Sequence, residues 1–173
     1  MKDVKELLGN LRGTFDGIGA DIDQDGKLRL EADRDALMSV LSFLRDSGFD
    51  YLQMVSCVDR MDDGTMELVY VLSSYPGPDG NMEGVLYCIL KVGLPGDNAR
   101  TLSVIPLYEC AEPYEREIHE LFGVHFHGHP RLTPLFLERE YPVPPFRKDF
   151  DTRKYVGDFF DSIPPVEEEG DTV

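Results

Sequence analysis

The chain has 173 residues, enough for one domain with a core of its own and too few to require two. Its formal net charge of −16 argues against a nucleic-acid partner, because phosphate binding needs a cationic surface. No apolar run approaches the roughly 18 residues needed to cross a bilayer, and the amino terminus lacks the apolar core of a secretory signal. We therefore expect a cytosolic protein that reaches a membrane only through a partner.

Residues 3–12 are predicted to form a short helix, because apolar residues recur there at helical spacing. Residues 14–31 are interpreted as two strands around the turn Asp-Gln-Asp-Gly. The same turn matches the start of an EF-hand calcium loop at Asp21, Asp23 and Asp25, but alanine stands at the twelfth position, where a bidentate glutamate belongs. A plain hairpin is therefore favoured, with a calcium site as the alternative.

An amphipathic helix is predicted over residues 34–47. Asp33 is the expected N-cap, and Gly48 supplies a left-handed residue at the carboxyl end. Phe49 is expected to fold back on Leu44, which would complete a Schellman motif.

Strand-like runs separated by turns rich in Asp, Gly and Pro follow at residues 51–58, 66–73, 84–93 and 101–108. Pro113 suits the first position of a helix that carries residues 115–122. Strands that meet at hairpins, with a few helices and no regular alternation, predict an α+β fold with a mixed, largely antiparallel sheet packed against helices. The globular domain is expected to span residues 1–129.

Residues 130–163 contain many prolines, which disfavour helix and sheet, and also many large apolar side chains. A disordered linker would not carry so many aromatic residues. We therefore predict an extended, Pro-rich arm that buries these side chains on another protein, with an arm wrapped over its own domain as the alternative. Residues 164–173 are acidic and are expected to form a disordered tail.

Residues 115–130 form the most specific stretch of the chain, with acids, an arginine, histidines and glycines on a short helix and the turn after it. Arg116 and Glu120 are four residues apart and are expected to pair on one helix face. Glu115 and Glu117 lie in the first turns, where the helix dipole favours acids. A solvated charged face is one interpretation; the favoured one is a cluster that fixes how the arm leaves the domain or that pairs with a neighbouring subunit.

This stretch resembles the signature of the thirty-kilodalton subunit family of respiratory complex I, the subunit designated C. An Arg-Lys-Asp element follows after prolines, as in the family, and the similarity covers most of residues 30–155. Thr133 departs from the family pattern, in which a basic residue or proline usually stands. The residues that carry the resemblance are Glu115, Arg116, Glu117, Glu120, Leu121, Phe122, Gly123, Gly128, His129, Pro130, Arg147, Lys148 and Asp149.

The resemblance implies a peripheral, non-catalytic subunit of an NADH or F420H2:quinone-type dehydrogenase, or of an energy-converting nickel–iron hydrogenase. The arm would bind and stabilise the hydrogenase-large-subunit-like chain (the subunit designated D in complex I), beside the iron–sulfur subunit. Iron–sulfur clusters and the nickel–iron or quinone site would lie in these partners, on the cytoplasmic side of the membrane. This chain would bind no cofactor, and the electron donor and acceptor stay open.

All histidines of the chain lie within residues 119–129. In an extended segment His125, His127 and His129 would point the same way. They define an alternative zinc or nickel site, with His119 or Glu117 as a fourth ligand. The competing function is therefore a metal- or calcium-regulated binding protein.

The cysteines, Cys57, Cys88 and Cys110, form no Cys-x-x-Cys pair, so an iron–sulfur site is not expected. They are interpreted as buried, reduced packing residues. The sequence also lacks a P-loop, a Gly-x-Gly-x-x-Gly turn and a Gly-x-Ser-x-Gly elbow, and it gives no support for an active site of its own.

Overall fold

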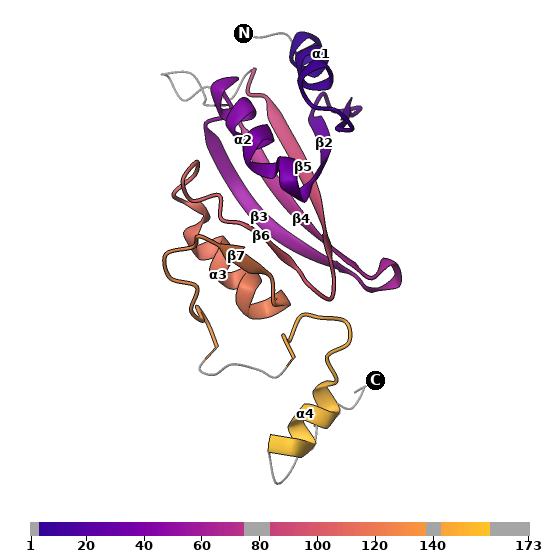
Figure 1. Cartoon of the computed structure of the whole chain (residues 1–173), viewed down its shortest axis with the longest axis vertical. Helices are drawn as coiled ribbons and strands as arrows, with labels where there is room; N and C mark the ends of the chain where they lie inside the picture. Colours follow the sequence, from indigo (N-terminus) through magenta and orange to yellow (C-terminus); the bar gives the residue numbers. More distant parts are fainter. Residues whose placement is uncertain (1–3, 75–83, 138–142, 160–173) are drawn as a thin grey trace, which may run out of the picture.

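The computed structural model of the protein describes residues 4–74, 84–137 and 143–159 (Figure 1). The α-helices are α1 (Val4–Thr14), α2 (Leu37–Asp46), α3 (Ala111–Phe122) and α4 (Thr152–Phe159), and the short 3₁₀ helices are η1 (Arg34–Ala36) and η2 (Met61–Asp63). The strands are β1 (Gly19–Ile22), β2 (Leu28–Asp33), β3 (Tyr51–Arg60), β4 (Thr65–Ser73), β5 (Tyr87–Pro95), β6 (Arg100–Leu102) and β7 (His125–His127). Within these residues, no helix has the length and apolarity needed to span a membrane.

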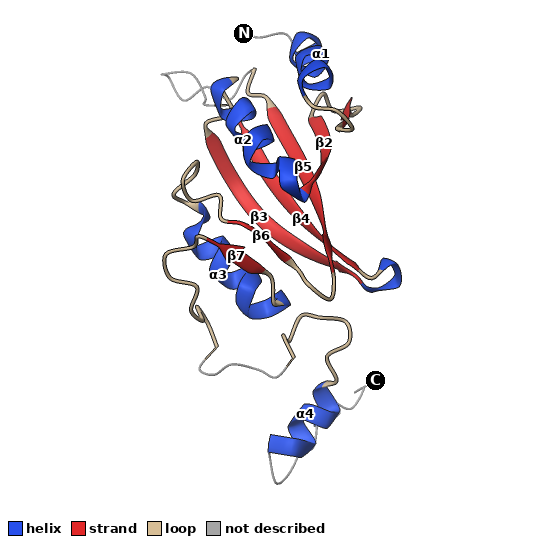
Figure 2. Ribbon diagram, viewed as in Figure 1, coloured by secondary structure: helices blue, strands red, loops and turns tan. Residues whose placement is uncertain are grey.

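Strands β1 to β5 form the main sheet of the described part of the chain, in the order β1-β2-β5-β4-β3. Only the β2–β5 pair is parallel; the other neighbours are antiparallel. Strands β6 and β7 pair in parallel as a small second sheet. The predicted mixed, largely antiparallel sheet with a few helices is therefore confirmed (Figure 2).

The core lies between the main sheet and the helices α1, α2 and α3. Alternate residues of β4 and β5 are buried, as expected for strands with one face on a core. Leu7 and Leu11 of α1, Leu41 and Leu44 of α2 and Ile118 of α3 all join this one cluster. Packing on the sheet thus holds α3 in place, and α4 lies away from the sheet (Figure 1).

The carboxyl end of α2 agrees with the prediction from the sequence, but its amino end does not. Phe49 donates its backbone N–H to the Leu44 carbonyl at 3.0 Å, and Gly48 has φ +101°, so the predicted Schellman motif is confirmed. The predicted N-cap is wrong: Asp33 precedes the 3₁₀ helix η1 and forms no side-chain cap.

The strand predicted over residues 101–108 is wrong beyond Leu102. The backbone turns there instead, and Leu107 and Tyr108 both donate to the Val104 carbonyl at 2.9 Å. Helix α3 begins at Ala111, which puts Pro113 at the third position of the helix and not the first. A proline is tolerated there because first-turn N–H groups have no partner within the helix.

The turn after β1 is a hairpin, as predicted. The Asp23 carboxylate accepts hydrogen bonds from the backbone N–H groups of Asp25 and Lys27 at 3.0 and 2.9 Å and pairs with Arg29 at 3.0 Å. The Lys27 amide, followed by Arg29, lowers the pKa of Asp23. The carboxylate is occupied by its own hairpin, so the geometry lends no support to a calcium loop.

The cysteine prediction holds for two residues and fails for the third. Cys57 and Cys88 are buried free thiols, and burial raises the pKa of each to about 12. Cys110 is exposed, at the turn that starts α3.

The carboxyl-terminal segment is not extended throughout. Helix α4 occupies residues 152–159, where the chain has no proline, and Asp151 caps it by accepting the N–H groups of Arg153 and Lys154 at 3.0 Å each. The prediction of extended backbone is therefore wrong for this part. The tail predicted at residues 164–173 lies outside the described residues.

Candidate functional site

Helix α3 lies against β3 and carries the charged residues of the signature. Its apolar stripe, which includes Ile118 and Leu121, is buried. The helix ends as predicted at Gly123, which has φ +80° and donates its N–H to the His119 carbonyl at 2.9 Å. A Cβ atom at this position would lie 2.8 Å from Cγ of Pro144. Glycine is therefore required at position 123 for two reasons: its left-handed backbone conformation and the close approach of Pro144.

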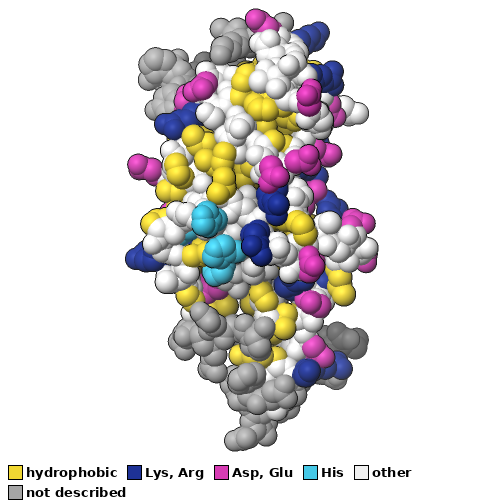
Figure 3. Space-filling model, viewed as in Figure 1, with side chains coloured by type: hydrophobic (Ala, Val, Ile, Leu, Met, Phe, Trp, Pro, Cys, Tyr) yellow, Lys and Arg dark blue, Asp and Glu magenta, His cyan; other side chains and the backbone are white. Residues whose placement is uncertain are grey.

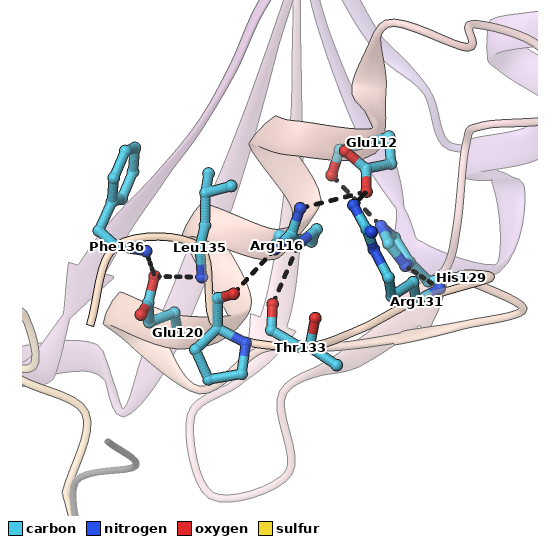
Figure 4. Close-up of polar contacts among 9 residues, drawn as sticks. Glu112, Arg116, Glu120, His129, Arg131, Thr133, Leu135 and Phe136 are labelled. Carbon is cyan, nitrogen blue, oxygen red and sulfur yellow. Dashed lines mark hydrogen bonds and ion pairs between the residues drawn. The ribbon is translucent and has the colours of Figure 1, made fainter. Parts of the chain in front are cut away.

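Arg116 binds the backbone that follows the signature (Figure 4). Its Nε donates to the Thr133 carbonyl at 3.0 Å and its Nη2 to the Pro134 carbonyl at 2.8 Å. Nη1 lies 3.4 Å from the carboxylate of Glu112, one helical turn earlier. The predicted pair with Glu120 is therefore wrong. The residue is buried, so these charge-assisted bonds act with little competition from water.

Glu120 binds the same segment through its amides. One carboxylate oxygen accepts the N–H groups of Leu135 at 3.1 Å and Phe136 at 3.0 Å, and the other accepts that of Leu137 at 2.5 Å. Three successive N–H groups on one carboxylate form an anion-binding nest. Arg116 thus binds the carbonyls of residues 133 and 134, and Glu120 binds the amides of residues 135–137. These contacts hold the backbone of the segment and do not involve its side chains.

His129 joins the start of this segment to α3. Its Nδ1 accepts the backbone N–H of Arg131 at 3.0 Å, so that nitrogen carries no proton. The proton therefore sits on Nε2, which lies 3.2 Å from the Glu112 carbonyl and donates to it. Gly128 and Pro130 flank His129 in an exposed turn.

The second element that carries the resemblance, Arg147-Lys148-Asp149, reaches back to the sheet. Arg147 donates to the Gly96 carbonyl at 3.0 Å and pairs with Asp149 at 3.1 Å. The Lys148 N–H donates to the buried carboxylate of Asp59 at 2.9 Å. These contacts fix residues 147–149 against the ends of β3 and β5.

Two phenylalanines on the held segments point outward. Phe136 remains 67% exposed and Phe146 59% exposed, although their backbone N–H groups donate to Glu120 and to the Leu121 carbonyl. The Phe146 ring touches that of Phe122 with centroids 5.8 Å apart. The domain therefore fixes the backbone and leaves large apolar side chains in solvent.

Glu115 has a different role from the one predicted. It is fully buried, and one carboxylate oxygen accepts the Val104 N–H at 2.7 Å. The other oxygen is buried without a hydrogen-bond partner in the described structure. Desolvation raises the pKa of Glu115 to about 7, against the opposing effect of hydrogen bonds from Ser103 and Val104. Its function is to tie the turn after β6 to α3. Glu117, in contrast, is half-buried and no contact assigns it a role.

Within the described residues the histidines form no metal-binding group, although the ring centroids of His119 and His125 lie 6.2 Å apart. His125 and His127 are exposed on β7, while His119 binds the Val124 carbonyl through Nδ1 at 2.8 Å. Among residues 4–74, 84–137 and 143–159, no group of three or more His, Cys, Asp or Glu side chains is placed to hold a metal ion.

Sequence reasoning missed Glu112 and Asp59. Glu112 precedes Arg116 by one helical turn, which is a readable pairing signal. Asp59 has no such signal, because it meets Lys148 from 89 positions away.

Proteins similar to this chain are subunits of multisubunit respiratory complexes. One relative is the subunit designated C of the F420H2 dehydrogenase of Methanosarcina mazei, 35% identical over 153 residues that cover 86% of this chain and 92% of the relative. Another is the subunit with the same designation in the NADH-quinone oxidoreductase of Moorella thermoacetica, 32% identical over 117 residues that cover 67% of this chain and 74% of the relative.

Residues 30–156 match the family model of the respiratory-chain NADH dehydrogenase 30 Kd subunit, and the chain belongs to this family. A chain in the structure of the membrane-bound sulfane sulfur reductase, an archaeal respiratory membrane complex, superposes with a TM-score of 0.80 at 25% identity and covers 99% of both chains. The trypsin-resistant fragment (1–134) of Nqo5 gives a TM-score of 0.63 at 25% identity and covers 75% of this chain and 98% of the fragment. The resemblance identified from the sequence is confirmed.

Proposed function

We propose that this chain is a non-catalytic subunit of the peripheral arm of a complex-I-like, membrane-associated oxidoreductase. In this role it binds and stabilises the hydrogenase-large-subunit-like partner, next to the iron–sulfur subunit. The binding element is the carboxyl-terminal arm, residues 130–163, and the globular domain of residues 1–129 is its support.

The observation that carries this proposal is the contrast between held backbone and exposed side chains. Arg116 and Glu120 fix the backbone of residues 133–137. Phe136 and Phe146 nevertheless stay largely in solvent. An arm that served only to cover its own domain would turn its largest apolar groups inward, because burial is their main source of stability.

A backbone that is already fixed also favours binding. Ordering a flexible segment on association costs free energy, and a segment already held in its bound shape avoids much of that cost. Interfaces concentrate their energy in a few buried aromatic anchors. Phe136 and Phe146 are such anchors. Glu120 binds the backbone N–H of Phe136, and the Leu121 carbonyl binds that of Phe146.

The division into domain and arm has independent support. The fragment of Nqo5 that resists trypsin covers about three quarters of this chain. Resistance to trypsin is typical of a folded body, since exposed connecting segments are the usual sites of proteolysis.

The proposal assigns electron transfer to the partners. Iron–sulfur clusters and the nickel–iron or quinone site belong to those subunits, and this chain holds none. Attachment to the cytoplasmic side of the membrane then occurs through the complex. Metal analysis of the purified chain tests this part: a stoichiometric metal ion would contradict it.

The decisive experiment measures capture of the hydrogenase-large-subunit-like partner by the purified chain. Phe136→Ala combined with Phe146→Ala removes anchors worth about 1–2 kcal/mol each, so the affinity should fall about 100-fold. Met61→Ala is the control, because Met61 is 54% exposed on the η2 turn and lies outside the arm. If the double variant bound like the control, the arm would not be the interface.

A further inference from the structure

The small sheet of β6 and β7 borders a hollow of ≈ 510 Å³ whose lining is rich in basic and imidazole groups. The residues that line it are Arg34, Asp35, Arg100, Thr101, Leu102, His125 and His127. None of them takes part in holding the arm. In Figure 3 the histidine side chains gather beside Lys and Arg side chains on this face of the molecule.

The strand register explains why these side chains gather. Arg100 lies opposite His125, and Leu102 lies opposite His127. Alternate residues of a strand share a face, so all four side chains project from the same side of the small sheet. Arg34 is the first residue of η1, the 3₁₀ helix that directly precedes α2. Three separate parts of the chain therefore build one surface.

This surface has the opposite charge to the rest of the molecule. The chain has 33 acidic and 17 basic residues, yet the hollow has two arginines against one aspartate. That aspartate, Asp35, is 91% exposed at 3.4 Å from Arg34, so it compensates the arginine weakly. The Nε of Arg100 donates a hydrogen bond to the neutral side chain of Asn98 at 2.6 Å. Most of its donors, on Nη1 and Nη2, have no partner within the described residues.

We propose that this hollow is a second docking site, which takes an acidic segment of a partner polypeptide in the complex; this inference rests on the proposed function. Carboxylates of the segment would pair with Arg34 and Arg100, since guanidinium groups match carboxylates in planar geometry. Leu102 supplies the apolar part of the contact, because its side chain is 51% exposed between these polar groups. A polypeptide offers both kinds of group side by side, whereas a free anion offers only charge.

The chemistry also separates this site from the arm. The arm contributes buried apolar anchors, and the hollow contributes charge, which sets encounter rate, salt dependence and orientation. A partner held at both sites is fixed in rotation as well as in position.

Charge reversal tests the site in the assembled complex. The chain with Arg34→Glu and Arg100→Glu should bind its partner at least about tenfold more weakly than wild type at low salt. The difference should shrink as salt is added, because salt weakens the wild-type attraction and also screens the new repulsion. Arg45→Glu combined with Lys5→Glu changes the net charge equally at positions that do not line the hollow. This control should keep the wild-type affinity to within about twofold. Equal losses in both double variants would overturn the proposal, because the effect would then come from overall charge.

Photo-crosslinking separates this proposal from the proposed function. A benzoylphenylalanine in place of Leu102 should crosslink, within the purified complex, to a partner segment rich in Asp and Glu. The same probe in place of Phe136 reports on the arm. A crosslink from the arm position without one from position 102 would overturn the docking site and leave the proposed function standing. Failure of both would overturn both, and a position-102 crosslink to a segment without acids would overturn the site alone.

Discussion

Glu115→Gln should remove a pH dependence of stability that the wild-type chain carries in its core. The buried carboxyl has a pKa raised from 4.5 to about 7. Between these values the folded state keeps a proton that the unfolded chain has released. The contribution of Glu115 to stability is therefore full below pH 4.5 and is lost as the pH rises through about 7. Glutamine stays neutral and can still accept the Val104 N–H.

The magnitude follows from the size of the shift. Each pKa unit is worth about 1.4 kcal/mol, so the shift corresponds to about 3 kcal/mol. Between about pH 5 and pH 8 the free energy of unfolding of the variant should rise relative to wild type by roughly 2–3 kcal/mol. The amide nitrogen replaces the unpartnered carboxyl oxygen and adds buried N–H donors, but the cost of burying them does not depend on pH.

The assay is urea unfolding followed by far-UV circular dichroism, since the chain has no tryptophan. Glu117→Gln is the control, because it makes the same charge change on the same helix at a half-buried position. The reasoning is refuted if the two variants show the same pH-dependent difference from wild type.

The remaining predictions concern the held segment. Glu120→Gln should speed hydrogen exchange at the amides of residues 135–137 by about tenfold or more, with secondary structure unchanged; exchange rates equal to wild type would count against the nest. Arg116→Ala should cost about 3 kcal/mol of unfolding free energy and reduce the yield of assembled complex, and a variant that assembles normally would contradict the role of Arg116 in holding the arm. Truncation after Leu132 should leave a chain with a cooperative unfolding transition that no longer captures its partner, and loss of folding would place the arm in the domain's own core.

Much of the fold can be read from local sequence because its determinants are local. The Schellman end of α2 depends on Gly48 and on Leu44 and Phe49, which are neighbours in the chain. The hairpin after β1 depends on Asp23 and the residues just after it. Alternation of buried residues along β4 and β5 predicts strands for the same reason. The charged signature of residues 115–130 is likewise a contiguous run, so the family is readable from the residues alone.

The binding partners of the charged side chains of α3 depend on the tertiary structure. Spacing along α3 made Arg116 and Glu120 look like partners, yet each binds the backbone of a segment 15 to 18 residues away. Glu115 occupies the same helix but faces the core, so burial and not the helix dipole controls its proton. The sequence by itself determined that this helix is charged and that an aromatic arm follows it. Only the packing determined that the charges hold the arm's backbone, because backbone N–H and C=O groups carry no signature in the sequence and accept whichever charged side chain the fold brings to them.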